Sequence, residues 1–248
     1  MIKKIVQASL GRFGLRVIRT DSTFQQIDGL VPFFAAIKGL GFAPSYIIDI
    51  GANRGNWTRQ AVRFFPNSHY ILIEPQDHLK RYVQDLVKRG HSIQWINAGV
   101  SDKAGTLAFT VSSRDDSSSF VPTQEEARRD GLTQVSVAVK TLNEIVAASN
   151  MGVPDMVKID AEGFDLKVLS GASDLFGKTE IFLAEAIIFG RKDENTLSAV
   201  LDKMASAGYL MIDITALNRS PKTGLLWLCE VAFIRDDSPL LKGAWVYE

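Results

Sequence analysis

Short apolar runs alternate with helix-like segments from Tyr46 onward, and this alternation constrains the fold more than any other feature of the sequence. The runs are Tyr46–Ile50, His69–Ile73, Ser92–Asn97, Met156–Asp160 and Ile181–Ala186. Most are apolar nearly throughout instead of at every second residue, as is typical of parallel strands that helices cover on both faces. Strands that alternate with helices in this way predict a doubly wound α/β sheet.

The segments between the runs complete this prediction. Helices are expected at Trp57–Phe65, Asp77–Lys88, Leu166–Leu169 and Glu194–Ala207, where proline or glycine follows several of the segments. The runs Tyr209–Ile214 and Leu226–Ile234 are joined by the turn-rich Asn218–Gly224. They predict an antiparallel hairpin at the end of a mostly parallel sheet.

Two regions depart from the alternation. Residues 1–44 are predicted to form an N-terminal helical region, because Ile27, Leu30 and Phe34 recur at helical spacing and Gly39, Gly41 and Pro44 close the segment. Residues 45–248 are predicted to form the main domain. Within it, residues around 102–140 hold two strand-like runs with serine-rich and charged segments between them, which predicts an inserted hairpin and short helix over the sheet edge or the site.

Charge and cysteine content narrow the class of protein. The chain has 248 residues, and its 28 Lys and Arg balance its 28 Asp and Glu. No overall charge therefore attracts nucleic acid, and no nucleic-acid partner is expected. The single cysteine, Cys229, forms no internal disulfide, and no apolar run reaches the length of about 18 residues that a transmembrane helix needs. The basic start lacks a secretory pattern, so we expect a cytoplasmic protein whose oligomeric state is open.

The turn after the first run is the strongest functional signal. Residues Asp49-Ile50-Gly51-Ala52-Asn53-Arg54-Gly55 lie between a strand and a helix, where doubly wound sheets bind nucleotide-like ligands. The spacing is Gly-x-x-x-Gly instead of the dinucleotide pattern Gly-x-Gly-x-x-Gly. Asp49 would repel a phosphate and suits a cationic amino group. Glu74 ends the second strand, where an acid can accept both hydroxyls of a ribose.

A second acidic pattern, Asp160-Ala161-Glu162-Gly163, ends the fourth run. Asp160 is the first candidate for a general base or substrate anchor, and Glu162 is the second. Glu185 adds a carboxylate at the end of the next strand, and Asp160 with Glu185 could instead hold Mg²⁺. The alternatives are that Asp160 or Glu162 caps the following helix, and that Lys158 is a structural partner of one acid.

These patterns together resemble the FkbM family of S-adenosylmethionine-dependent methyltransferases. The resemblance rests on Asp49–Gly55, Ile73-Glu74-Pro75, Lys158–Gly163, Val168–Ala172 and Thr141-Leu142-Asn143-Glu144, together with the serine cluster before Phe120. It covers residues 45 to 186. It implies the Rossmann-like sheet of class I methyltransferases and methyl transfer from S-adenosylmethionine, most often to a hydroxyl oxygen of a sugar or natural product.

The resemblance also implies roles for individual residues. Gly51, Ala52, Asn53 and Gly55 should lie against the methionine part of the cofactor, and Glu74 should hold its ribose. Asn97, Ala98, Gly99 and Val100 should lie near the adenine. The implied acceptor is a small molecule or glycan. Two rivals remain: a nicotinamide-dependent oxidoreductase, since Glu74 would also suit an NAD ribose, and a non-catalytic domain that keeps the fold for binding or assembly.

Overall fold

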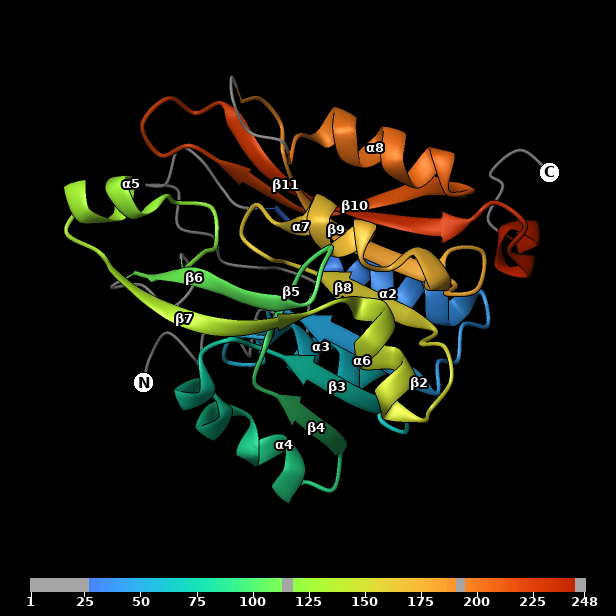
Figure 1. Cartoon of the computed structure of the whole chain (residues 1–248). Helices are drawn as coiled ribbons and strands as arrows, with labels where there is room; N and C mark the ends of the chain where they lie inside the picture. Colours follow the sequence, from blue (N-terminus) through green and yellow to red (C-terminus); the bar gives the residue numbers. More distant parts are fainter. Residues whose placement is uncertain (1–26, 113–117, 191–194, 244–248) are drawn as a thin grey trace, which may run out of the picture.

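The computed structural model describes residues 27–112, 118–190 and 195–243. Within them, eight strands form one sheet in the order β1-β10-β11-β9-β8-β2-β3-β4, with helices on both faces (Figure 1). Its strands are β1 (Ile27–Asp28), β2 (Tyr46–Ile50), β3 (His69–Ile73), β4 (Ser92–Ile96), β8 (Met156–Ile159), β9 (Ile181–Ile187), β10 (Tyr209–Arg219) and β11 (Leu226–Arg235). The α-helices are α2 (Leu30–Gly39), α3 (Asn56–Phe64), α4 (Gln84–Lys88), α5 (Gln124–Arg129), α6 (Leu142–Ser149), α7 (Asp165–Ser170) and α8 (Leu197–Ser206).

The centre of the sheet is parallel. Strand β2 pairs in parallel with β3 and β8, and β4 and β9 continue the sheet in the same direction on either side. Strand β11 runs antiparallel between β9 and β10. The predicted doubly wound, mostly parallel sheet with a C-terminal antiparallel hairpin is therefore confirmed. The carboxyl ends of β2, β3, β4, β8 and β9 all meet at one edge.

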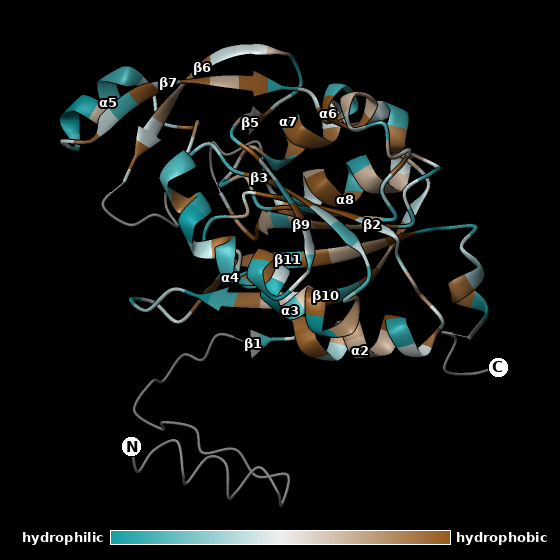
Figure 2. Cartoon of the chain, turned by 90° about the horizontal axis from the view of Figure 1, so that it is seen from below, coloured by the Kyte–Doolittle hydropathy of each residue, from teal (hydrophilic) through white to brown (hydrophobic). Residues whose placement is uncertain are grey.

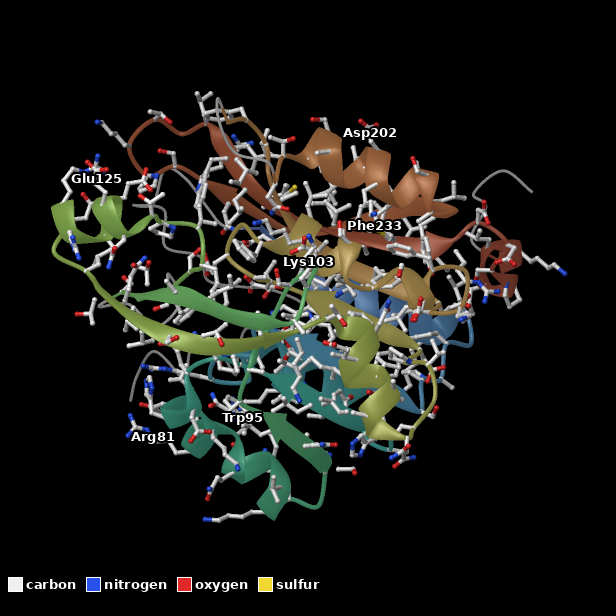
Figure 3. All side chains as sticks on the ribbon, viewed as in Figure 1. Arg81, Trp95, Lys103, Glu125, Asp202 and Phe233 are labelled. Atoms are coloured by element: carbon white, nitrogen blue, oxygen red, sulfur yellow. The ribbon has the colours of Figure 1, made fainter. Side chains whose placement is uncertain are left out.

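Each face of the sheet has its own apolar core. Helices α2, α3 and α4 pack on one face, and α6, α7 and α8 pack on the other. On the second face, Phe233 of β11 belongs to the same cluster as Val200 and Met204 of α8 (Figure 3). All five residues of β2 are buried, which is why its sequence is almost uniformly apolar.

A second, three-stranded sheet stands beside the main one. It consists of β5 (Gly99–Val100), β7 (Thr133–Lys140) and β6 (Gly105–Val111), with β6 and β7 antiparallel. Helix α5 lies between β6 and β7 in the chain, and its outlying surface is mostly hydrophilic (Figure 2). The hairpin and short helix predicted for this segment are present. We call the part from β6 to β7 the insert.

The N-terminal part of the chain differs from the prediction. Ile27–Asp28 form a short strand that pairs with β10, where the sequence spacing suggested helix. Helix α2 packs into the same core as strands of the main sheet, with Phe34 fully buried. Residues 1–26 lie outside the described residues, so the division at residue 44 stays a prediction. None of the helices in the described residues has the length and apolar character that a membrane span requires.

Candidate active site

The turn after β2 is in close contact with the carboxyl ends of the neighbouring strands β3 and β8. The backbone N–H groups of Gly51 and Ala52 donate to the carbonyl oxygen of Ile73, at 2.9 and 3.2 Å. A Cβ on Gly51 would stand 1.8 Å from the carbonyl oxygen of Asp160, and its φ is +68°. No other residue type fits there, since both the space and the backbone conformation require glycine.

Beside this turn lies a cavity of about 80 Å³, which we call the turn cavity. Eight of the predicted site residues line it: Gly51, Asn53, Glu74, Ala98, Gly99, Val100, Asp160 and Glu162. The other predicted cofactor-binding residues, Asp49, Ala52, Gly55 and Asn97, do not. Among the described residues, no Lys, Arg or His lines the turn cavity, so its three carboxylates give it a negative lining.

Glu74 is held by backbone groups on two sides. The N–H of Asn53 donates to one carboxylate oxygen at 2.9 Å, and the N–H of Gln76 donates to the other at 3.0 Å. Burial raises the pKa of Glu74, while these two hydrogen bonds oppose the rise. Asn53 adopts a left-handed conformation with φ +47°, which turns its N–H toward the acid. Glu74 is thereby fixed with both oxygens at the cavity wall.

Lys158 lies behind the turn and joins two acids. Its Nζ is 3.3 Å from Asp49 and 3.2 Å from Asp160, and it donates to the carbonyl oxygens of Ile50 and Gly51 at 3.2 Å each. Asp49 also accepts a hydrogen bond from Thr58 Oγ1 at 2.5 Å. Lys158 is therefore a structural partner of both acids, which the sequence had offered as one alternative.

The predicted residues outside the cavity support its walls. The side-chain amide of Asn97 donates to the carbonyl oxygens of Glu74 and Pro75, at 3.1 and 2.8 Å, and so joins the ends of β3 and β4. Ala52 is buried in the core with Trp57. Gly55 precedes α3 with φ +74°, and a Cβ there would stand 2.6 Å from Val83 Cγ1. These residues support the walls of the turn cavity, and their contact with a cofactor stays a prediction.

The insert supplies one wall of the turn cavity. Phe120 packs against Phe109 and Phe164, with ring centroids 4.7 and 5.4 Å away. A Cβ on Gly99 would stand 2.5 Å from the Phe120 ring, so glycine admits this aromatic side chain. Ser119 Oγ donates to the carbonyl oxygen of Glu162 at 2.8 Å. The serine cluster before Phe120 was the one sequence sign of this contact.

A second cavity, of about 820 Å³, opens on the other side of Phe120 and Glu162, and we call it the large cavity. Phe120 and Glu162 line both cavities, so they form the boundary between the two. The aromatic side chains of Phe164 and Trp227 and the polar side chains of Gln124, Gln134, Glu185, Asn195 and Lys167 also line the large cavity. The mixture of aromatic faces and hydrogen-bonding groups suits a polar ligand with apolar ring faces.

The described residues give no support to the Mg²⁺ site considered for Asp160 and Glu185. No group of three or more His, Cys, Asp or Glu side chains in them is arranged to hold a metal ion. Asp160 lines the turn cavity and is paired with Lys158, whereas Glu185 lines the large cavity. The two acids thus face different spaces.

Comparison with known proteins identifies the family. The model of the methyltransferase FkbM domain matches residues 49–211, which include the turn, Glu74, the insert and the Asp160–Gly163 segment. This chain belongs to the FkbM methyltransferase family. The resemblance found in the sequence covered residues 45–186, and the match extends to residue 211.

Two curated relatives are named as methyltransferases. Hexuronic acid methyltransferase AglP from Haloferax volcanii is 24% identical over 69% of this chain and 65% of its own length. Methyltransferase sdnD from Sordaria araneosa is 27% identical over 52% of this chain and 61% of its own length. The matches thus cover less than two thirds of each relative's length.

Solved structures agree with the fold. Cofactor-bound Rv0187 from MTB superposes with a TM-score of 0.50 at 14% identity, over 84% of this chain and 78% of that one. At this identity the likeness concerns the fold alone. The sheet is that of class I methyltransferases, with β2 at the centre and an antiparallel strand inserted near one edge.

Proposed function

We propose that this protein transfers a methyl group from S-adenosylmethionine to a hydroxyl oxygen of a saccharide or secondary-metabolite acceptor. The observation that carries the proposal is the turn cavity, which lies at the carboxyl ends of β2 and β3 and is lined by Glu74, Asp160 and Glu162 without a basic side chain among the described residues. A negative lining favours a cationic ligand and disfavours the pyrophosphate of a dinucleotide.

The residues of the turn cavity fit the chemistry of this cofactor. Each Glu74 oxygen accepts one backbone hydrogen bond, and Oε1 also accepts a long one of 3.4 Å from the Gln76 side chain. One ribose hydroxyl can donate to the remaining lone pair of Oε2, and a second can replace the Gln76 amide at Oε1. Ala98, Gly99 and Val100 offer an apolar wall next to Glu74 for the adenine. Asp160, on the other side, can attract the positively charged methionine part.

The size of the turn cavity implies a movement of the insert. A cavity of about 80 Å³ is smaller than the roughly 300–1,000 Å³ typical of ligand pockets. Phe109, Ser118 and Phe120 of the insert form the wall that limits it. We therefore expect Phe120 to swing outward when the cofactor binds, because the walls outside the insert are strand ends and the loops that directly follow them.

The large cavity is our proposed acceptor site. Its volume of about 820 Å³ is ample for an acceptor larger than one sugar ring. Trp227 and Phe164 offer aromatic surfaces for the apolar face of a sugar, and the side chain of Gln124 and the side-chain oxygen of Gln134 offer hydrogen-bonding groups for its hydroxyls. The name of the Haloferax relative, a hexuronic acid methyltransferase, supports a saccharide acceptor.

The two cavities meet where methyl transfer would have to take place. When bound, S-adenosylmethionine would supply an electrophilic methyl group on a positively charged sulfur. Glu162 lines both cavities, so its carboxylate can contact an acceptor hydroxyl and orient it toward the donor side. Orientation of this kind can supply about 7–11 kcal/mol of a transfer barrier.

The proposal is tested with the full chain, S-adenosylmethionine labelled in its methyl group and a panel of saccharides that includes hexuronic acids. We expect label in a saccharide and its retention after mild alkali, because a methyl ether resists alkali whereas a methyl ester of a carboxylate is hydrolysed. Release of the label by alkali would overturn transfer to a hydroxyl. Absence of label in every saccharide, from protein that binds the cofactor, would overturn the saccharide acceptor.

Trp227 provides a test of the acceptor site with a matched control. Trp227 on β11 and Leu210 on β10 have similar exposed fractions, 41% and 42%, but only Trp227 lines the large cavity. We expect Trp227→Ala to raise KM for the saccharide without changing the affinity for S-adenosylhomocysteine, and Leu210→Ala to change neither. Equal effects of the two substitutions would place the acceptor elsewhere.

A further inference from the structure

Glu185 stands at the meeting point of the two cavities, on the acceptor side. It lies on β9, which runs parallel to β8 with Ala184 opposite Ile159. Glu185 is therefore the β9 residue next to Asp160, the residue that follows β8. Neighbouring strands are about 4.8 Å apart. Asp160 lines the turn cavity and Glu185 lines the large cavity. Glu185 therefore lines the proposed acceptor cavity, and the neighbouring strand carries Asp160, which lines the proposed donor cavity.

The backbone of Glu185 is fixed on both sides by two buried residues. Its N–H donates to Asp165 Oδ1 at 3.3 Å, and its carbonyl oxygen accepts from Asn195 Nδ2 at 3.0 Å. Asn195 Nδ2 also donates to Asp165 Oδ2 at 3.2 Å. Asp165 and Asn195 are 0% and 3% exposed, so this arrangement holds the end of β9 in place. These hydrogen bonds involve only the backbone of Glu185 and not its side chain.

The carboxylates near the boundary differ in their partners. Asp160 is paired with Lys158, whose Nζ lies 3.2 Å from Asp160 Oδ2. Glu162 has a left-handed backbone with φ +50° and joins the insert through its carbonyl oxygen. Within the described residues, the Glu185 carboxylate has no hydrogen bond or ion pair. This carboxylate of the large cavity is therefore available for a proton.

We propose that Glu185 is the general base of the methyl transfer. The acceptor oxygen forms a bond to the methyl carbon while the carbon–sulfur bond breaks and leaves its electron pair on sulfur. The hydroxyl proton passes to a carboxylate oxygen of Glu185 and is later released to solvent through the open large cavity. This inference rests on the proposed function, and it moves the role of base from Asp160 to Glu185.

The electrostatic surroundings of Glu185 agree with this role. Burial raises the pKa of Glu185 well above its ordinary value, and the carboxylates of Asp160 and Asp165 raise it further. Glu162 acts in the same direction. The ammonium of Lys158 opposes these effects, and Glu230 lies directly opposite Glu185 on β11. A base is most effective when its pKa is near the working pH. The raised pKa of Glu185 is closer to neutral pH than that of an ordinary glutamate.

The test compares Glu185→Gln with Asp160→Asn, Glu162→Gln and the control Glu230→Gln in the full chain, with the saccharide that accepts the methyl group. Glu185→Gln should lower kcat by about 10²–10⁴-fold, the usual contribution of a general base, and leave KM and the affinity for S-adenosylhomocysteine unchanged. In the wild type, kcat/KM should fall as the pH falls through the Glu185 pKa. Glu230→Gln should keep the wild-type kcat, since Glu230 lines neither cavity.

Two outcomes would overturn the role of Glu185: a wild-type kcat in Glu185→Gln, or an equal loss in Glu185→Gln and Glu230→Gln. A separate readout needs no acceptor. Carbon-13 NMR of glutamate labelled at its side-chain carboxyl carbon should contain a resonance that titrates well above the ordinary range, is missing from Glu185→Gln and is present in Glu230→Gln. A Glu185 resonance that titrates in the ordinary range contradicts the proposal. If the proposed function is wrong, no acceptor is methylated, but the Glu185 resonance still titrates well above the ordinary range.

Discussion

The Nζ atom of Lys158 lies 3.3 Å from Asp49 Oδ1, between side chains that are only 4% and 0% exposed. Burial lowers the pKa of Lys158, but the carboxylates of Asp160 and Asp49 raise it by more, so the lysine stays charged. Because the same ammonium donates to the carbonyl oxygens of Ile50 and Gly51, it joins β8 to the turn after β2. The position of the turn thus depends on a buried ion pair.

Replacement of this ammonium should destabilise the whole domain. Lys158→Met leaves Asp49 buried and without its counter-charge, and loss of one partner of a buried pair costs about 3–5 kcal/mol. Unfolding by urea measures this loss. Lys222→Met, in the exposed turn before β11, is the control and should unfold like the wild type. Equal stability of the two variants would show that the pair does not support the fold.

Alanine substitutions at Gly51 and Gly177 distinguish the cost of a steric clash from the cost of a left-handed backbone. Their φ angles are nearly equal, +68° and +71°, so Ala at either position pays about 1–2 kcal/mol for the left-handed conformation. Only at Gly51 does a Cβ also meet a backbone atom, the carbonyl oxygen of Asp160 at 1.8 Å. Gly51→Ala should therefore lower Tm clearly more than Gly177→Ala. Similar Tm values in the two variants would mean that the turn is not confined by β8.

Glu74→Gln should weaken cofactor binding. The substitution removes the charge and one acceptor oxygen, and hydrogen bonds to charged groups contribute about 1.5–3 kcal/mol each. The Kd of S-adenosylhomocysteine should then rise about 10–100-fold, as measured by calorimetry. Glu125→Gln, on the outlying helix α5 (Figure 3), should leave it unchanged. An unchanged Kd in Glu74→Gln would remove Glu74 from the proposed ribose site.

Glu230 gives the protein an unusual pH dependence of stability. Burial raises the pKa of Glu230 to about 7, and the Thr215 hydroxyl and Lys158 oppose the rise. Between the ordinary glutamate pKa of about 4.3 and about 7, the folded state binds more protons than the unfolded state, so the contribution of Glu230 to stability falls as pH rises.

Glu230→Gln removes this contribution. The variant should be more stable than the wild type at pH 8, and the gain should shrink toward pH 4. Urea unfolding of both proteins across this range measures the difference. A variant less stable than the wild type at pH 8 would mean that the ionised carboxylate is favourable in the fold.

Local sequence was sufficient for the central strands and the turn. Strands β2 and β3 have the predicted bounds, because an uninterrupted apolar run between turn residues has few other stable positions. The sequence also contained a sign of α6 that the prediction did not use. Thr141 and Glu144 form a reciprocal capping box at its start, as the spacing Thr-x-x-Glu allows.

Contacts between distant segments were not predictable in this way. Asp77–Lys88 was predicted as one helix, but it is a 3₁₀ segment, Asp77–Val83, followed by α4. The wall formed by Phe120 depends on its approach to Gly99 and Phe164, which no local pattern encodes. The pairing of Lys158 with Asp160 was one alternative that the sequence offered, and the role of Asp160 as a base stays a prediction.

Calorimetric titration of the full chain with S-adenosylhomocysteine and, separately, with NAD tests the central claim most directly. The claim is that the turn cavity beside Gly51 and Glu74 receives the methyl donor. We predict binding of S-adenosylhomocysteine and no binding of NAD, because the cavity has a negative lining without a basic side chain in the described residues. Binding of NAD without binding of S-adenosylhomocysteine would contradict the account and favour an oxidoreductase site.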